Sequence, residues 1–137
     1  MTVVLARVTD APLDVKEIEA LVLGDSDGAL VTFRGVVRDV DGGKAVTALD
    51  YSSHPDAERI LTECCSAVAA ETGLSLAAAH RVGPLTVGDT ALVAVVAAQH
   101  RAEAFAACAL LVDRIKAEVP IWKKQHYTDG VSDWVGL

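Results

Sequence analysis

The spacing of apolar side chains divides this chain into helical and extended segments. Helices are predicted over residues 13–23, 56–73 and 100–119. Asp14 can cap the first helix through its carboxylate, and Gly73 marks the end of the second. The first two helices therefore carry a boundary signal in the local sequence.

Segments of alternating or continuous apolar character lie between these helices. Strands are predicted over residues 3–9, 29–40, 45–53, 74–83, 90–99, 121–127 and 131–135. The turn DGGK at 41–44 joins two of them as a hairpin, and 84–89 is predicted to be a loop. Residues 90–99 are continuously apolar, which is typical of a central strand. The mixed order predicts an α+β fold, with two main helices against a largely antiparallel sheet.

The composition is that of one globular domain. Of 137 residues, 52% are apolar and 23% charged, so residues 1–137 are predicted to form a single soluble domain. The N-terminal residues do not have the pattern of a signal or transit peptide, so we expect none, and no apolar run approaches the roughly 20 residues of a membrane span. Three cysteines, two of them adjacent, do not suit a disulfide framework, and we expect a cytoplasmic protein.

The charge is unevenly distributed. A net charge of −7 argues against broad nucleic-acid binding and against an anionic membrane surface. Residues 98–126 nevertheless carry five basic side chains, whereas residues 1–33 carry two. A pocket for a small anion needs only such a local excess of positive charge.

The junction between strand 90–99 and helix 100–119 is the first candidate site. His100 and Arg101 follow the end of a buried strand and open a helix, whose free N–H groups favour an anion. These side chains suit a phosphate or an anionic ring. Equally, His100 can cap the helix while Arg101 is solvated.

Lys116 lies in the last turn of the same helix, at the edge of its apolar face. That face is expected to comprise Phe105, Cys108, Val112, Ile115 and Val119. Lys116 either complements the negative end of the helix dipole, which the pattern favours, or is a partly desolvated amine with a lowered pKa.

Pro120 ends this helix and turns the chain back into the strand 121–127. On that strand Lys123 and Lys124 point to opposite faces, so only one of them can reach a given pocket. Lys116 and Lys123 can then flank one anionic site across the turn.

Arg34 and Arg38 are four residues apart on the predicted strand 29–40 and share a face. They form either a guanidinium fork for a phosphate or carboxylate, or an ordinary exposed edge.

No CxxC pair or histidine at metal-ligand spacing is present, so we expect no metal site and three cysteines that act as small buried hydrophobes. The residues alone thus predict an α+β domain with a small anion pocket.

Three motifs occur in order along the chain. They are F-x-G-x-V-R at Phe33–Arg38, H-R-x-x-A-F at His100–Phe105 and K-x-x-x-P-I-W-K-K at Lys116–Lys124. Together they resemble the large, catalytic subunit of molybdopterin synthase. The resemblance extends from about Asp27 to Trp134 and so covers nearly the whole chain.

The resemblance implies an α/β hammerhead with an added antiparallel β part, and a sulfurtransferase without a cofactor of its own. That family converts cyclic pyranopterin monophosphate into the dithiolene molybdopterin, in molybdenum cofactor biosynthesis. Sulfur arrives as a thiocarboxylate on the C-terminal Gly-Gly of a small ubiquitin-like carrier subunit. Two large subunits form a homodimer, and this homodimer together with two carrier subunits forms a heterotetramer. This chain ends Val135-Gly136-Leu137, so we expect it to be the acceptor and not the carrier.

Residue roles follow from the resemblance by matching positions. Lys116 is expected to lie nearest the Gly-Gly tail, for acid/base or transient covalent chemistry, while Lys123 assists and stabilises negative charge. Trp122 is expected to pack the returning strand down from its other face. The expected substrate-binding residues are Arg38, His100, Arg101 and Phe33.

Two further readings use the same pocket. One is a small-anion-binding module or scaffold subunit without chemistry, and the other is a subunit that has lost activity and only assembles with its partner. The retained Lys116, Lys123 and His100 favour the enzyme, because an anion sensor needs positive charge but not two lysines around one turn.

Overall fold

The computed structural model describes residues 2 and 4–136 of the chain. Its elements in order are β1 (Val4–Thr9), α1 (Val15–Val22), β2 (Ala29–Val36), β3 (Val40–Asp41), β4 (Lys44–Ser53), α2 (Ala57–Thr72), β5 (Ser75–Arg81), β6 (Gly83–Thr86), β7 (Thr90–Ala98), α3 (Arg101–Glu118), β8 (Ile121–Tyr127) and β9 (Ser132–Gly136). Val3, the first residue of the strand predicted over 3–9, lies outside the described residues. This order of helices and strands confirms the predicted α+β class.

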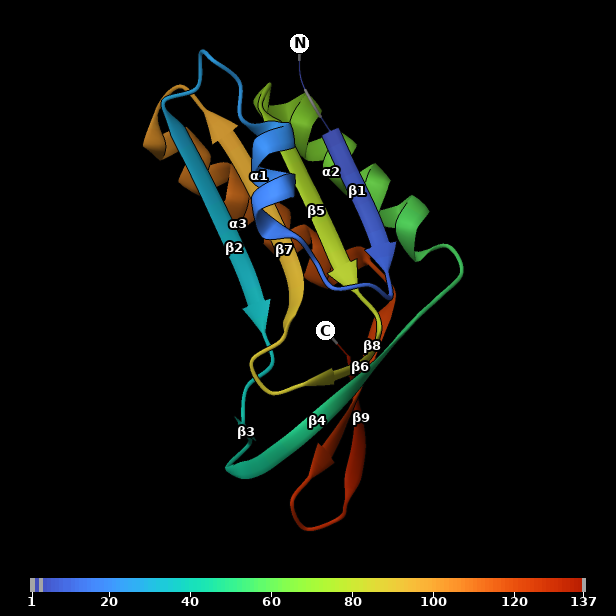
Figure 1. The fold of residues 1–137 in the computed structure, drawn as a ribbon. Coiled ribbons are helices and arrows are strands. Elements are labelled where there is room, and N and C mark those ends of the chain that lie inside the picture. Colours follow the sequence, from blue (N-terminus) through green and yellow to red (C-terminus); the bar gives the residue numbers. More distant parts are fainter. Residues whose placement is uncertain (1, 3, 137) are drawn as a thin grey trace.

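A four-stranded sheet in the order β1-β5-β7-β2 forms the centre of the molecule (Figure 1). β1 pairs with β5 in parallel, and the remaining pairs are antiparallel. β7 lies inside the sheet, and its residues 91–98 are all buried, which confirms the central strand predicted from its apolar run. α1 covers one face of this sheet, and α2 and α3 cover the other.

Alternation along the central strands divides the core between the two faces. Val93 and Val95 of β7 pack with Ile18 and Val22 of α1. The intervening side chains face the opposite way and pack with α2 and α3; they are Leu92, Ala94 and Val96. The small alanines of β5 let the helices approach the sheet closely.

The predicted helix boundaries are confirmed at two positions. The Asp14 carboxylate accepts a hydrogen bond from the backbone N–H of Glu17 at 3.1 Å, as an N-cap does. Gly73 has a left-handed backbone with φ of 72° and donates its N–H to the carbonyl of Ala69.

A second sheet extends from one end of the first, with the strand order β3-β4-β8-β9 and β6 paired to β4 (Figure 1). Two predictions are wrong here. The segment expected as a loop over 84–89 begins with β6, because Gly83–Thr86 pairs with β4. The strand expected over 29–40 is interrupted, because β2 ends at Val36 and β3 begins only at Val40.

None of the described helices combines the length and the apolar character that crossing a membrane requires.

The Gly28 backbone lies against the end of β7. Its N–H donates to the carbonyl of Ala98 at 3.0 Å, and a Cβ added to Gly28 would lie 2.6 Å from the carbonyl oxygen of Gln99. This contact is with backbone, so a side chain at Gly28 would force apart the segments that hold the start of β2 and the start of α3.

We expect Gly28→Ala to lower the free energy of unfolding by about 1–3 kcal/mol, because the added methyl group collides with backbone that cannot move aside freely. Urea denaturation measures this. Gly24→Ala is the matched control: its Cβ would meet the Asp27 carboxylate at 3.2 Å, the end of a side chain that can rotate. Equal losses in the two variants would contradict the explanation.

Candidate active site

A cavity of about 230 Å³ lies where the first sheet meets the second. Its lining residues are Gly35, Val36, Arg38, Tyr51, His80, Ala91, Leu92, Lys116 and Lys123. Three of these side chains are basic, and among the described residues none that lines the cavity is acidic. In a chain of net charge −7, this local excess of positive charge suits an anionic ligand.

The end of α3 and the following turn bring two lysines to this cavity. The helix stops at Val119, whose N–H donates to the carbonyl of Ile115, and Pro120 directs the chain back as β8. Lys116 in the last turn and Lys123 on β8 both line the cavity. Lys124 points to the opposite face, where its ammonium lies 5.7 Å from the centre of the Trp134 ring.

The side chains that pack β8 against the rest of the protein differ from those predicted. Trp122 was expected to pack this strand, but its side chain is 44% exposed. Ile121 and Gln125 are buried instead, at 2% and 3% exposure, on the same face as Lys123. The alternation of the strand therefore places the packing residues and the pocket lysine together and leaves Trp122 outside.

The ammonium group of Lys123 is destabilised by its surroundings. Burial lowers the pKa of Lys123; the Asp41 carboxylate opposes this, and the positive charges of Lys116 and Arg38 lower the pKa further. An ammonium with a lowered pKa releases its proton more readily than an ordinary lysine does, which suits a group that takes part in proton transfer.

Arg38 is held at the rim of the cavity by a short chain of polar contacts. Its guanidinium lies 3.7 Å from the carboxylate of Asp41, and its side chain is 71% exposed. Asp41 accepts a hydrogen bond from the buried amide of Gln125, and that bond is the main cause of a lowered pKa of the Asp41 carboxyl. Gln125 thus fixes the carboxylate that orients Arg38.

Of the two alternatives left open for Arg34 and Arg38, the structure does not support the guanidinium fork. Arg34 donates from Nη2 and Nε to the hydroxyl of Thr90, at 2.6 and 3.1 Å, and is absent from the cavity lining. β2 ends at Val36, so Arg38 lies on the irregular segment after the strand, whereas Arg34 lies within the strand.

His80 and Tyr51 line the cavity and were missed from the sequence. The His80 side chain is 2% exposed, and its ring meets Tyr51 edge-on with 5.0 Å between ring centres. Burial lowers the pKa of His80 to about 4; the Arg81 carbonyl opposes this, and the charge of Lys116 adds to it. The available signal was a histidine directly after the apolar run LAAA, within the predicted strand LSLAAAHRVG.

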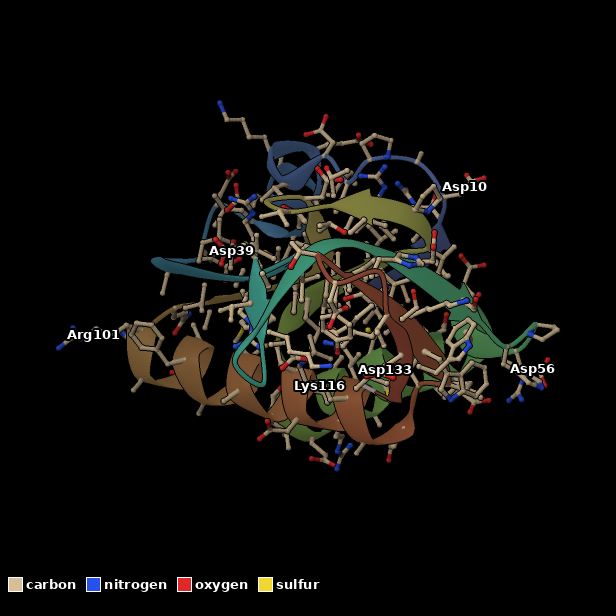
Figure 2. All side chains as sticks on the ribbon, turned by 90° about the horizontal axis from the view of Figure 1, so that it is seen from below. Asp10, Asp39, Asp56, Arg101, Lys116 and Asp133 are labelled. Carbon is tan, nitrogen blue, oxygen red and sulfur yellow. The ribbon has the colours of Figure 1, made fainter. Side chains whose placement is uncertain are left out.

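His100 and Arg101 lie at the other end of α3 from Lys116 (Figure 2). Fifteen residues of helix separate Arg101 from Lys116, or about 22 Å at the rise of an α-helix. Both side chains are exposed, and His100 occupies the N-cap position without a side-chain capping bond. One copy of the chain therefore does not bring these two residues to the lysine cavity.

Phe33 lies in an apolar groove between β2 and α3, together with Phe105, Cys108 and Val112. It does not line the lysine cavity. Phe105, which was predicted to be buried with the apolar face of α3, is 61% exposed. The reason is that β2 is the edge strand of its sheet, so no further strand of this sheet covers the first turns of α3 beyond it.

The remaining polar features suit an anionic ligand less well. A larger cavity of about 630 Å³ is lined by Asp25, Asp27 and Glu103, whose charges repel anions.

The cysteines are free and buried, as predicted, and burial raises the pKa of Cys64 and of Cys65 to about 12. A thiolate nucleophile is therefore disfavoured at both of these positions.

Comparison with known proteins gives concordant results. The sequence profile of the family described as MoaE protein matches residues 8–118. The molybdopterin synthase catalytic subunit 1 of Mycobacterium tuberculosis is 41% identical over 134 residues, covering 95% of this chain and 89% of that protein.

Solved structures agree in fold. The crystal structure of molybdopterin synthase from Staphylococcus aureus matches with a TM-score of 0.89 and 31% identity, over 96% of this chain and 97% of that chain. A complex of subunits 1 and 2 of the molybdopterin-converting factor from Helicobacter pylori matches with a TM-score of 0.68 over 98% of this chain and 88% of that chain. Its identity is 19%, so it supports the fold alone.

We expect the pKa of Lys123 to lie below the ordinary lysine value of 10.5, and we expect its titration midpoint to change when a neighbouring charge is removed. Lys116→Ala removes a like charge and raises the midpoint, whereas Asp41→Asn removes the favourable carboxylate and lowers it. NMR of the ¹³C-methylated protein between about pH 7 and 11 measures both shifts.

Lys124→Ala is the matched control for this titration, because that side chain lies on the other face of β8 and should leave the Lys123 midpoint in place. A midpoint at or above 10.5, or shifts of the same sign in the two test variants, would contradict this description of the site.

Proposed function

Because the chain belongs to the MoaE protein family, the family of molybdopterin synthase catalytic subunits, we propose that it transfers sulfur to cyclic pyranopterin monophosphate. The product is the dithiolene molybdopterin. The sulfur donor is the thiocarboxylate at the C-terminal Gly-Gly of a small carrier subunit. The observation that carries the proposal is the cavity in which Lys116, Lys123 and Arg38 converge.

The residues of the cavity divide the chemistry between them. Arg38, held by Asp41, meets the anionic group of the substrate. Lys116 lies nearest the incoming tail and provides acid/base or transient covalent chemistry. Lys123, whose lowered pKa suits proton transfer, assists Lys116 and stabilises the negative charge that develops on sulfur and oxygen. Each transfer converts one thiocarboxylate into a carboxylate, so two carriers are consumed for each dithiolene. The two thiols of raised pKa, Cys64 and Cys65, are not required, because the carrier supplies the sulfur.

The site is shared between two copies of the chain in this proposal. β2 is an edge strand, and Ala29 at its start pairs with Ala98, next to the beginning of α3. If β2 of a second copy lies antiparallel along this edge, the first turn of that copy's α3 approaches the end of β2 where the lysine cavity opens. His100 and Arg101 of the second copy then complete the anion site.

Two observations support this arrangement. The cavity of one copy, about 230 Å³, is smaller than the roughly 300–1,000 Å³ of ordinary ligand pockets. The groove beside β2 carries Phe33 and the exposed Phe105, an apolar surface that a second copy would cover. Phe33 in this proposal lines the joint site from the interface.

The full assembly is a homodimer with one carrier on each large subunit, a heterotetramer. Residues 1–137 act as one domain in it. A cytoplasmic location is part of the proposal, and the three free cysteines support it.

We expect Lys116→Ala to lower the rate of molybdopterin formation by about 100-fold or more, because the cavity loses its acid/base group. The assay mixes the chain with a thiocarboxylated Gly-Gly carrier and cyclic pyranopterin monophosphate, and follows the fluorescent oxidised product. Lys123→Ala should also be impaired. Lys124→Ala, on the opposite face of β8, is the control and should retain activity.

The same assay separates the enzyme from the alternatives. A wild-type chain that binds the pterin phosphate without forming product would favour a small-anion-binding or scaffold subunit instead.

A shared site predicts complementation between two inactive variants. Lys116→Ala and Arg101→Ala damage the same composite site from different copies. A mixed dimer therefore has one site with both substitutions and one intact site. Equal mixing with full subunit exchange makes half of the dimers mixed, so activity should return to about a quarter of wild type. No recovery, with exchange verified by mass spectrometry, would contradict the shared site.

A further inference from the structure

We propose that His80 is a specificity-determining residue, whose Nε2 accepts a hydrogen bond from a ring N–H of the pterin substrate. The identity of the ligand rests on the proposed function. The acceptor itself follows from the geometry of the cavity.

The His80 ring is held in one orientation and one tautomer. Its Nδ1 lies 2.7 Å from the carbonyl oxygen of Arg81. A carbonyl oxygen can only accept, so Nδ1 carries the proton and donates it, which leaves Nε2 with a free lone pair in the neutral ring. The edge-on contact with Tyr51 and the burial of the side chain restrict rotation of the ring.

The Nε2 atom has no hydrogen-bond donor among the residues that the structure describes. The only bond found for the His80 ring within residues 2 and 4–136 is the one at Nδ1. In the same part of the chain, Nε of Arg81 is the one buried side-chain nitrogen or oxygen that is both fully enclosed and without a partner. Nε2 of His80 also lacks a partner, so it is not fully enclosed, and it is accessible from the cavity that His80 lines. A buried acceptor that opens on a cavity and lacks a donor gains free energy when a ligand supplies one.

This acceptor contrasts with its surroundings. The charged side chains of the cavity, Arg38, Lys116 and Lys123, are all donors, and they serve the anionic part of a ligand. Burial and the nearby Lys116 charge keep the pKa of His80 near 4, so the ring stays neutral and able to accept near pH 7. A sulfate dianion, which has no O–H group, cannot donate to such an acceptor. A ligand that carries both a phosphate and ring N–H groups, as a reduced pterin phosphate does, uses donors and acceptor together.

Two nearly isosteric variants test the acceptor at the position of Nε2. His80→Asn keeps an amide N–H near the position of Nδ1, where it can donate to the Arg81 carbonyl, but has no atom at Nε2. His80→Gln places an amide oxygen near Nε2. Calorimetric titration of cyclic pyranopterin monophosphate, without carrier, should show about five- to tenfold weaker binding to His80→Asn and recovery of most of that loss in His80→Gln.

Sulfate is the control ligand, because it tests the cations without the ring and, being fully deprotonated near pH 7, has no O–H group that could donate to Nε2. It should bind wild type and both variants alike. Wild-type affinity of His80→Asn for the pterin would overturn the proposal. A loss for sulfate equal to that for the pterin would also overturn it, because the substitution would then have disturbed the cations.

The substitution of His80 could also weaken pterin binding indirectly, by displacing Lys116, and a double variant tests this. In a Lys116→Ala chain, His80→Asn should still weaken pterin binding. If the effect disappears there, His80 acts by positioning Lys116 and the proposal is wrong.

Should His80→Asn fail to fold, the ligand can be altered instead. Against wild type, one member of a series of singly N-methylated pterin phosphates should bind about five- to tenfold more weakly than the others, because its methyl group replaces the donor that His80 accepts from. A uniform series would overturn the proposal. A wild-type chain that binds sulfate but not the pterin would count against the proposed function itself, which is a different failure.

Discussion

Burial of β7 between two layers of helices is the constraint on which the site depends. Every residue from 91 to 98 is buried, so the strand cannot shift or turn over without exposing its whole apolar surface. Ala91 and Leu92 at its start line the lysine cavity, and His100 follows its far end. α3 then runs back along the sheet and returns Lys116 to the level of Ala91. One buried strand and one antiparallel helix thus decide which basic residues meet.

Bringing like charges together is costly, and the structure limits the cost in particular ways. Arg38 remains largely exposed and paired with Asp41. Lys123 is the more buried of the two lysines, and its lowered pKa is the consequence. The Asp41 carboxylate is the nearby counter-charge, and a buried amide from β8 holds it in place. The cavity can therefore be cationic within an acidic chain, and it is prepared for an anion before one arrives.

The burial of the cysteine thiols explains why this subunit and the carrier have different roles. The thiols of Cys64 and Cys65, with pKa values of about 12, pack in the core and do not serve as sulfur nucleophiles. A chain that offers positive charge and proton transfer needs its sulfur from elsewhere, as a thiocarboxylate carrier provides. In the proposed dimer, a second copy packs along the exposed edge of β2 and the apolar groove beside it, and supplies the second half of the anion site.

The sequence by itself determined the features that depend on near neighbours. The Asp14 cap, the glycine stop at Gly73, the buried β7 and the opposite facing of Lys123 and Lys124 all follow from local periodicity and backbone chemistry. The tertiary structure alone decided the end of β2 between Arg34 and Arg38, the exposure of Phe105 and the entry of His80 into the cavity. These depend on strand order, register and sheet edges, which arise from contacts between residues far apart in the chain, and spacing along one segment carries no information about them.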